Sequence, residues 1–498
     1  MSDDLNFVMA ARREKLDAMR AQGLEPFAYS FDRSHTALQA AALVPEDVHE
    51  GPAGEVRLAG RLVALRAHGK TTFAHLADAT GRVQLYFRRD DLADQYAKLN
   101  LLDVGDVVGL SGVPFRTRTG EPTVRVTSFD VLAKSLRPLP FGKEEVGADG
   151  SVVRHMGFTD PEQRYRQRYA DLAVHPEVRA TFVARARMIS AIRTFLDGRG
   201  YLEVQTPVLQ PLYGGAAARP FTTHHNALDT PLFLRIADEL YLKRLIVGGM
   251  ERVYEIGQDF RNEGMDRTHN PEFTMLEFYE AYADYNVMMD VVEELIVAAA
   301  NAVRGVAGFG DLVPLLETPF ARVEWLGALN AGLGEDALSL DTPALLQRAR
   351  SLGVERAETM SRPKLLDELF QALVECTITT PTFVVDYPAE LSPLAKPKRG
   401  DARLTERFEL FANGREMANA FSELNDPLDQ RERFEAQARL RLAGDEDASG
   451  VDEDYLRAME YGMPPTGGVG IGVDRLLMYL TNTQHIRDVI LFPTMRPE

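Results

Sequence analysis

The stretch from residue 252 to 285 places charged side chains where a core would be apolar, in a pattern of strand, loop and strand. Alternation along the second strand puts Glu277 on one face with Met275 and Tyr279, a costly position for a carboxylate without a partner. An arginine at a strand end can hold a phosphate, and an aromatic ring can stack on a base. The residues that could do this chemistry are Arg261, Glu263, His269, Asn270 and Phe273. Each of these residues alone could equally well be an ordinary surface or core residue, so the prediction depends on the whole cluster.

A second stretch, from 407 to 427, brings two carboxylates together. Asn413 and Gly414 form a strong signal for a two-residue hairpin, and that turn would set Glu409 opposite Ala418. Glu409 and Glu416 would then be diagonal neighbours on one face, where two carboxylates repel each other unless they share a hard cation such as Mg²⁺. An exposed hairpin with two solvated glutamates is the alternative.

Three further residues of this stretch could belong to the same pocket: Asn419, Phe421 and Glu423. Strict alternation would send them to the face opposite Glu416. A bulge between Glu416 and Asn419 is therefore required if all of these side chains line one pocket.

A third stretch, from 464 to 480, is a glycine-rich strand followed by an apolar helix. Its glycines Gly467, Gly468, Gly470 and Gly472 clear side chains from the strand, so that a flat ligand can approach the backbone. Arg475 lies in the first turn of the helix. The pattern is neither a Walker A loop nor a dinucleotide fingerprint, and tight packing explains the glycines equally well.

The elements that must position these groups change in character along the chain. We predict a helical extension over 1–54, a five-stranded barrel of OB-fold type over 55–140, a linker over 141–159, and a domain of mixed strands and helices over 160–498, with a helical insertion at about 286–376. The fold class is α+β. The basic side chains of the first helix either touch RNA or form a solvated face.

The composition of the chain limits the classes of function that it can have. The chain has 498 residues, a formal charge of −18 and 45% hydrophobic residues, which is typical of a multidomain globular protein and argues against a general nucleic-acid binder. The single cysteine, Cys376, excludes a disulfide framework and a zinc site built from cysteines. Because the sequence contains neither a signal-peptide core nor an apolar run long enough to span a bilayer, we expect a cytoplasmic protein that does not enter a membrane.

At the three stretches the chain resembles the class II aminoacyl-tRNA synthetases, and the bacterial-type lysyl-tRNA synthetases in particular. The helix and strand before Pro207 resemble the family's first motif, which lies at its dimer interface. FRNEG and HNPEF resemble the second motif, and TGGVGIGVDR resembles the third. The resemblance covers nearly the whole chain and implies a homodimer with an antiparallel catalytic sheet flanked by helices. It also implies ATP-dependent activation of L-lysine to lysyl-adenylate with release of pyrophosphate, followed by transfer of lysine to the 3′-terminal adenosine of tRNA(Lys).

The resemblance assigns the ATP site residue by residue. The implied ATP-binding residues are Arg261, Glu263, His269, Asn270, Phe273, Glu409, Gly472 and Arg475. Arg261 and Arg475 are the implied catalytic groups. Arg261 would hold the α-phosphate and the amino-acid carboxylate, and Arg475 would hold the γ-phosphate. Glu409 and Glu416 would hold Mg²⁺. No protein nucleophile is required, because positioning and charge neutralisation suffice for this reaction.

The implied lysine-binding residues are Gly215, Glu239, Glu277, Tyr279, Asn419, Phe421 and Glu423. Glu239 would meet the α-amino group, whereas Glu277 and Glu423 would face the side-chain ammonium. Aspartyl- and asparaginyl-tRNA synthetases would need cationic or amide groups at the matched positions. A catalytically inactive relative that only binds RNA, and a lysine ligase that acts on a protein, are the alternatives from other classes.

Phe73 and Gln84 are the candidates for anticodon binding in the barrel, with a place in the barrel core as the alternative for Phe73. Three positions depart from the family pattern. Tyr213 stands where a small or aliphatic residue is usual and would crowd the pocket entrance. Asp238 replaces a usual proline and would cap the following helix, and Gln205 replaces a usual glutamate.

Overall fold

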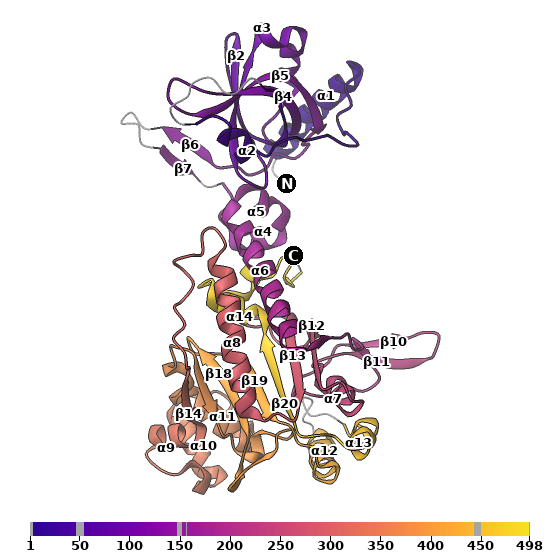
Figure 1. The fold of residues 1–498 in the computed structure, drawn as a ribbon, viewed down its shortest axis with the longest axis vertical. Helices are drawn as coiled ribbons and strands as arrows, with labels where there is room; N and C mark the ends of the chain where they lie inside the picture. Colours follow the sequence, from indigo (N-terminus) through magenta and orange to yellow (C-terminus); the bar gives the residue numbers. More distant parts are fainter. Residues whose placement is uncertain (1–2, 46–53, 147–151, 156, 443–449, 498) are drawn as a thin grey trace. The chain divides into compact units, whose positions relative to one another are not determined.

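The computed structural model describes residues 3–45, 54–146, 152–155, 157–442 and 450–497, which form two compact units, Met1–Val174 and His175–Glu498. The first unit contains a closed barrel with the strand order β1-β2-β3-β5-β4 (Figure 1). Its strands are β1 (Val56–His68), β2 (Thr71–Ala77), β3 (Arg82–Arg88), β4 (Val107–Arg116) and β5 (Pro122–Ala133). Alternate side chains of these strands fill one buried apolar cluster. The predicted five-stranded OB-type barrel is confirmed.

The remaining elements of this unit flank the barrel in sequence. They are α1 (Asp3–Ala21), α2 (Ala37–Ala42), α3 (Arg89–Leu92), the 3₁₀ helix η1 (Ala93–Leu101), β6 (Lys143–Val146), β7 (Val152–His155), α4 (Pro161–Arg166) and α5 (Arg168–Val174). The segment 141–159, predicted as a linker, contains the antiparallel pair β6–β7. Its strands are only four residues long, too short for the alternation of hydrophobic and polar residues to mark them.

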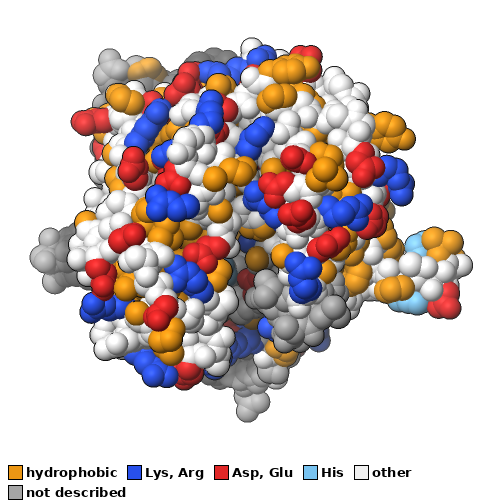
Figure 2. All heavy atoms as spheres, turned by 90° about the horizontal axis from the view of Figure 1, so that it is seen from below, with side chains coloured by type: hydrophobic (Ala, Val, Ile, Leu, Met, Phe, Trp, Pro, Cys, Tyr) orange, Lys and Arg blue, Asp and Glu red, His pale blue; other side chains and the backbone are white. Residues whose placement is uncertain are grey.

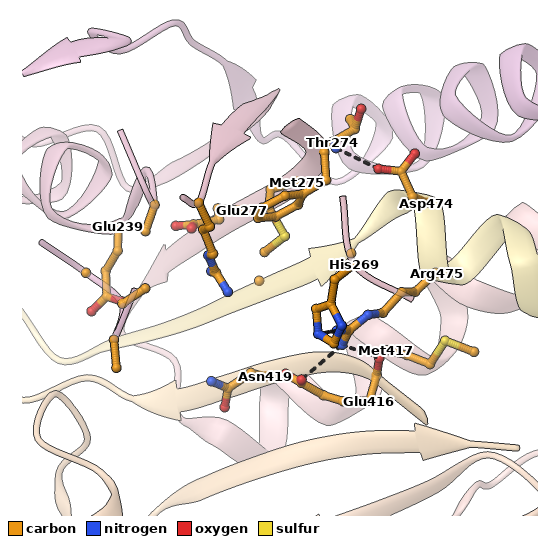
Figure 3. Close-up of a pocket in the computed structure, with 18 of the residues that line it drawn as sticks. Glu239, His269, Thr274, Met275, Glu277, Glu416, Met417, Asn419, Asp474 and Arg475 are labelled. Carbon is orange, nitrogen blue, oxygen red and sulfur yellow. Dashed lines mark hydrogen bonds and ion pairs between the residues drawn. The ribbon is translucent and has the colours of Figure 1, made fainter. Parts of the chain in front are cut away.

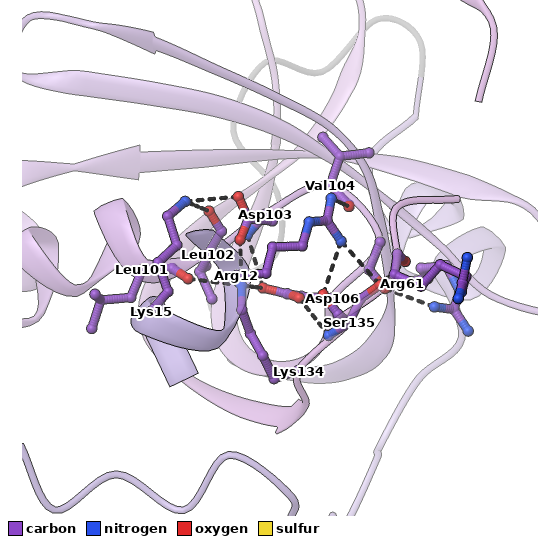
Figure 4. Close-up of polar contacts among 12 residues, drawn as sticks. Arg12, Lys15, Arg61, Leu101, Leu102, Asp103, Val104, Asp106, Lys134 and Ser135 are labelled. Atoms are coloured by element: carbon purple, nitrogen blue, oxygen red, sulfur yellow. Dashed lines mark hydrogen bonds and ion pairs between the residues drawn. The ribbon is translucent and has the colours of Figure 1, made fainter. Parts of the chain in front are cut away.

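Polar contacts attach α1 to the barrel (Figure 4). Arg12 donates to the carbonyl oxygens of Val104 and Ser135 at 2.9 and 2.8 Å, and the Lys15 ammonium lies 2.7 Å from an Asp103 oxygen. The fully buried Lys134 ammonium donates to the same Asp103 at 2.5 Å. At Arg12 the helix therefore presents neither a solvated face nor an RNA contact, because its guanidinium satisfies barrel carbonyls.

The second unit is built on an eight-stranded sheet with the order β14-β15-β18-β19-β20-β13-β12-β8. The strands are β8 (Leu202–Glu203), β12 (Arg252–Phe260), β13 (Glu272–Ala281), β14 (Ala321–Glu324), β15 (Thr382–Val385), β18 (Arg407–Ala412), β19 (Arg415–Ser422) and β20 (Thr466–Gly472). The five inner pairings are antiparallel as predicted, but both outer pairings, β14–β15 and β8–β12, are parallel. Long crossover segments separate the members of each outer pair, and such segments permit parallel pairing.

Helices cover the sheet in two groups. α6 (Pro176–Gly198) and α8 (Tyr285–Arg304) pack together along one face, and with α14 (Val473–Leu480) they enclose the largest apolar cluster (Figure 1). α9 (Trp325–Leu333), α10 (Thr342–Ser351) and α11 (Arg362–Leu373) form a separate cluster around the buried Trp325. The helical region predicted at 286–376 is thus divided, since α8 belongs to the main core.

Smaller elements complete the unit. They are β9 (Leu209–Gln210), β10 (Thr222–His225), β11 (Thr230–Leu234), α7 (Glu239–Val247), η2 (Ala337–Ser339), η3 (Ala357–Thr359), η4 (Glu375–Thr377), η5 (Ala389–Leu391), β16 (Pro397–Lys398), β17 (Asp401–Thr405), α12 (Pro427–Leu442), α13 (Glu453–Glu460) and α15 (Ile486–Val489). The β10–β11 hairpin projects at the right of Figures 1 and 2. On the face in Figure 2, acidic and basic side chains are interspersed and form no continuous basic field. Among the described helices, none has the length and apolar character needed to cross a membrane.

Candidate active site

A cavity of about 320 Å³ lies over β13, β19 and β20 in the second unit. Among the residues that line it are the predicted Gly215, Glu239, Arg261, Glu263, His269, Asn270, Phe273, Glu277, Tyr279, Glu416, Asn419, Phe421, Gly472 and Arg475. Of the residues predicted for the ATP, metal and lysine sites, only Glu409 and Glu423 are absent from this lining. Segments far apart in sequence therefore converge on one cavity.

Alternation along β13 explains one wall of the cavity. Met275, Glu277 and Tyr279 face the cavity, whereas the intervening Leu276 and Phe278 are buried in the main core. The predicted face of this strand is confirmed. Met275 was not predicted as a site residue, because a methionine beside aromatic residues is typical of a hydrophobic core.

The β18–β19 hairpin contains the predicted bulge. Phe411 pairs with Glu416, but Leu410 pairs with Ala418, so that Met417 is the extra residue of β19. The bulge lies between Glu416 and Asn419, and Asn419 consequently shares the cavity with Glu416.

The register on the far side of the bulge differs from the prediction. The turn residues Asn413 and Gly414 both have positive φ angles, 51° and 62°, as the predicted type of turn requires. Glu409, however, pairs with Asn419 and not with Ala418. The prediction was wrong by one residue because it counted strict pairs across the hairpin, and the bulge shifts that count.

At one end of the cavity, the charged side chains of Arg475 and Glu416 lie beside His269 (Figure 3). The Arg475 guanidinium is 3.2 Å from a Glu416 carboxylate oxygen and 3.0 Å from Nε2 of His269. Arg261 lies 5.1 Å from the Phe273 ring centroid, and its buried Nε–H has no hydrogen-bond partner among the described residues. A buried guanidinium N–H without an acceptor is costly, so this geometry suits an anionic ligand.

Glu409 lies beside this end of the cavity. Its carboxylate contacts Arg407 and accepts a hydrogen bond from the Tyr387 hydroxyl at 2.8 Å. Burial raises the pKa of Glu409 to about 7, with Arg407 opposing and the Glu416 charge adding to the rise. A hard cation would relieve this repulsion, so the pair fits Mg²⁺. Over the described part of the chain, no three His, Cys, Asp or Glu side chains converge to hold a metal by themselves.

At the other end, three carboxylates gather. Glu277 is 5% exposed, and it accepts hydrogen bonds from the Tyr279 hydroxyl at 3.0 Å and the Asp238 amide at 3.2 Å. Burial, reinforced by the charges of Asp259 and Glu239, raises the pKa of Glu277 to about 8. These contacts leave Glu277 without a cationic partner from the described residues, which makes it a suitable partner for a ligand ammonium.

Glu239 and Glu423 both contact the ammonium of Lys243. Glu423 is 1% exposed and lies against Gly468, where an added Cβ would collide with it. At Gly468 the missing side chain therefore makes room for protein side chains, which agrees with the packing explanation for this glycine. Sequence reasoning missed Lys243, because a glutamate and a lysine four residues apart on a helix usually mark a solvated face.

Two of the residues that depart from the family pattern, Tyr213 and Asp238, do not have the predicted effect. Tyr213 packs on Phe233, with ring centroids 5.1 Å apart, and is not among the residues that line the cavity. Asp238 stands at the N-cap of α7 but makes no capping hydrogen bond, because its buried carboxylate is 2.8 Å from the Arg235 guanidinium. Neither residue obstructs the cavity.

In the first unit, Phe73 and Gln84 lie on adjacent strands of the barrel. Phe73 is half-buried, packs on Tyr86 with a centroid distance of 5.0 Å, and is absent from the barrel core. Gln84 donates to Glu121 at 2.8 Å and accepts from the Thr123 hydroxyl. The alternative that placed Phe73 in the core is wrong, and an aromatic and an amide share the outer face.

Comparisons with known proteins agree with this geometry. A family model described as "tRNA synthetases class II (D, K and N)" matches residues 160–496, and one described as "OB-fold nucleic acid binding domain" matches residues 56–132. The chain is 51% identical to the lysine–tRNA ligase of Carboxydothermus hydrogenoformans, over 99% of both chains. It is 52% identical to that of Moorella thermoacetica, over 99% of this chain and 98% of the relative, and 48% identical to that of Oceanobacillus iheyensis, over the full length of both. With a matching OB-fold domain, a matching catalytic domain and relatives aligned end to end, the chain belongs to the class II tRNA synthetases, in the family of the lysine–tRNA ligases.

Proposed function

We propose that this chain is a lysine–tRNA ligase that works in two steps in one cavity. A carboxylate oxygen of L-lysine attacks the α-phosphorus of ATP, and the bond to the departing pyrophosphate breaks, which yields lysyl-adenylate. A hydroxyl of the 3′-terminal ribose of tRNA(Lys) then attacks the lysyl carbonyl carbon, its proton is lost, and AMP leaves. Both steps need positioning and charge neutralisation, and the cavity supplies groups for each.

The observation that carries the choice of amino acid is the gathering of Glu239, Glu277 and Glu423 at one end of the site. Lysine brings an ammonium at each end, and buried ammonium groups need carboxylate partners. Glu239 would receive the α-amino group, and the other two carboxylates would receive the side-chain ammonium. Aspartate or asparagine as substrate would bring no side-chain cation, which would leave Glu277 without a cationic partner.

At the opposite end, Arg261 would hold the α-phosphate and the lysine carboxylate through the N–H groups that protein acceptors leave unused. Phe273 would stack on the adenine, and Glu263 would accept a hydrogen bond from its amino group. His269 and Asn270 would orient the bent triphosphate. Gly472, at the end of β20, would let the nucleotide approach the backbone.

Arg475 would move from Glu416 to the γ-phosphate when ATP binds. Glu409 and Glu416 would hold Mg²⁺ together with phosphate oxygens, which is how this ion is usually bound. When bound, the ion neutralises phosphate charge and stabilises the leaving pyrophosphate. The raised pKa of Glu409 supports this role, because the pair needs a cation to be fully ionised.

The barrel would bind the anticodon. Phe73 supplies a partly exposed ring for stacking, and Gln84 supplies an amide for a base edge. The net charge of −18 implies that recognition depends on such local contacts.

We further propose a cytoplasmic homodimer. Three large apolar side chains are exposed beside the segment that resembles the first motif of the family: Leu202, Val208 and Leu209, at 52%, 40% and 51% exposure. Large apolar side chains exposed within one short segment are consistent with a surface that another protein covers. Analytical ultracentrifugation of the full chain would measure the dimer directly.

Aminoacylation of purified tRNA(Lys) tests the proposal as a whole. We expect ATP-dependent attachment of lysine to tRNA(Lys) and none to tRNA(Asp) or tRNA(Asn). A panel of the twenty amino acids in ATP–pyrophosphate exchange would separate activation from transfer, with exchange expected for lysine alone. Exchange that depends on aspartate or asparagine, or no exchange with any amino acid, would contradict the proposal.

A further inference from the structure

Lys243 is a fully buried lysine in α7 that does not line the cavity. Its ammonium contacts a carboxylate oxygen of Glu239 on one side and of Glu423 on the other. The Tyr279 ring centroid lies 6.0 Å from the same Nζ. Lys243 therefore bridges two of the three carboxylates from outside the cavity.

Other titratable groups face this ammonium from the neighbouring elements. They are Glu239 of α7, Tyr279 of β13, Glu423 after β19, and Tyr455 of α13. Burial lowers the pKa of Lys243, but Glu239 and Glu423 outweigh it and raise that pKa well above the ordinary range. Burial raises the pKa of Glu423, and Lys243 opposes that rise. The ammonium thus favours the ionised form of Glu423 in a site whose burial favours the neutral form.

The charges in this part of the site can be counted. Glu239, Glu277 and Glu423 contribute three negative charges when ionised, and Lys243 returns one positive charge. Among these four groups two negative charges remain, and the substrate assigned under the proposed function brings two ammonium groups. Asp238 and Asp259, which pair with Arg235, lie outside this count. Carboxylates that meet ammonium groups avoid the large cost of an unpaired buried ion.

On the proposed function, we infer that Lys243 is a positioning residue that sets the charge of the pocket. It holds the carboxylates of Glu239 and Glu423 in place and offsets one of their charges, so that the pocket matches an amino acid with two ammonium groups. Lys243 acts through the two glutamates and does not touch the substrate.

The inference makes a specific prediction for Lys243→Met, which replaces the ammonium with an apolar chain of similar length. Because Lys243 opposes the rise in the pKa of Glu423, removing the cation should raise that pKa above its wild-type value of about 8. Glu423 must lose its proton before it can pair with a ligand ammonium. Each further unit of pKa costs a factor of about ten in the ionised form at a pH below the wild-type pKa, so we expect the KM for lysine to rise about tenfold at pH 7. The increase should shrink as the pH is raised toward 9.

The measurement is lysine-dependent ATP–pyrophosphate exchange by the full chain from pH 6.5 to 9, with kcat and the KM values for lysine and ATP determined separately. The KM for ATP should stay within about threefold of the wild-type value, because the change lies at the lysine end of the site. Arg244→Met is a matched control, since it removes a cation from the next position of α7, where Arg244 pairs with Asp452 at 2.8 Å. The control should keep the wild-type KM for lysine at every pH.

Lys243→Gln separates charge from hydrogen bonding, and it also serves if the methionine variant does not fold. The amide can donate to both glutamates but carries no charge, so we expect the same pH-dependent rise in the KM for lysine. A wild-type KM in either neutral variant would overturn the inference. An equal loss of kcat, ATP binding and melting temperature that does not change with pH would also overturn it, because Lys243 would then be purely structural. Failure of the wild-type chain to activate lysine would instead refute the proposed function.

Discussion

Glu277→Gln offers the sharpest test of the lysine pocket, because it removes one charge while keeping the shape of the side chain. The amide oxygen can still accept from the Asp238 amide, and the amide nitrogen can donate to the Tyr279 hydroxyl. The side-chain ammonium of lysine would then lose a buried ionic partner. Such a loss costs about 3–5 kcal/mol, which corresponds to about two to nearly four decades in kcat/KM for lysine.

The same substitution should stabilise the substrate-free protein. The folded-state pKa of Glu277, about 8, lies above the ordinary value of 4.5, so the unfolded chain ionises this group first as the pH rises. The free energy of unfolding therefore falls between pH 4.5 and 8 in the wild type, by about 1.4 kcal/mol per pH unit. At pH 7 the wild type carries a penalty of about 3 kcal/mol that Glu277→Gln lacks.

Two assays check these effects on one pair of proteins. Lysine-dependent pyrophosphate exchange should fall by at least a hundredfold in the variant, with the KM for ATP nearly unchanged. Thermal unfolding should show a higher melting temperature for the variant at pH 7.5 and little difference at pH 4.5. A near-normal exchange rate would refute the assignment of Glu277. A stability difference that is the same at both pH values would refute the argument from its buried charge.

Further predictions concern other parts of the site. Gly468→Ala should raise the KM for lysine at least tenfold in pyrophosphate exchange, since its Cβ would lie closer to Glu423 and Tyr279 than van der Waals contact allows. Glu416→Gln should raise the Mg²⁺ concentration for half-maximal exchange about tenfold, and a wild-type Mg²⁺ dependence would argue against its metal role. Phe73→Ala should lower kcat/KM for tRNA(Lys) roughly tenfold or more while leaving lysine-dependent exchange intact, because it acts only on base stacking. An equal effect on both reactions would show that Phe73 serves the fold.

Alternation and glycine signals made much of the architecture predictable. The five barrel strands and the cavity face of β13 each show a period of two, and Asn413-Gly414 marks its turn unambiguously. The parallel edges of the sheet were not predictable in this way, because strands of two and four residues carry no period. Their pairing depends on crossovers that only the folded chain reveals.

Charged residues inside the protein were harder to assign than those at the cavity. Glu277 stands out because a carboxylate interrupts an apolar strand face. Lys243 and Arg407 do not stand out, since each has an acidic neighbour in sequence, as solvated residues commonly do. Arg407 in fact lies against the Tyr387 and Phe421 rings, at 4.5 and 5.6 Å from their centroids, with its side chain only 14% exposed. Only the long-range packing of the strands shows which charges are internal.

The bulge at Met417 has a consequence for how this hairpin can change in length. Deleting that one residue would remove the bulge and restore simple alternation along β19, with Glu416 and Asn419 two positions apart and still on the cavity face. Inserting one further residue would instead turn Asn419 to the opposite side, into the main core. A one-residue insertion between Glu416 and Asn419 should therefore abolish activity, whereas deletion of Met417 should be tolerated. In a deep mutational scan, this interval would be recognised by its tolerance of a shorter length but not of a longer one.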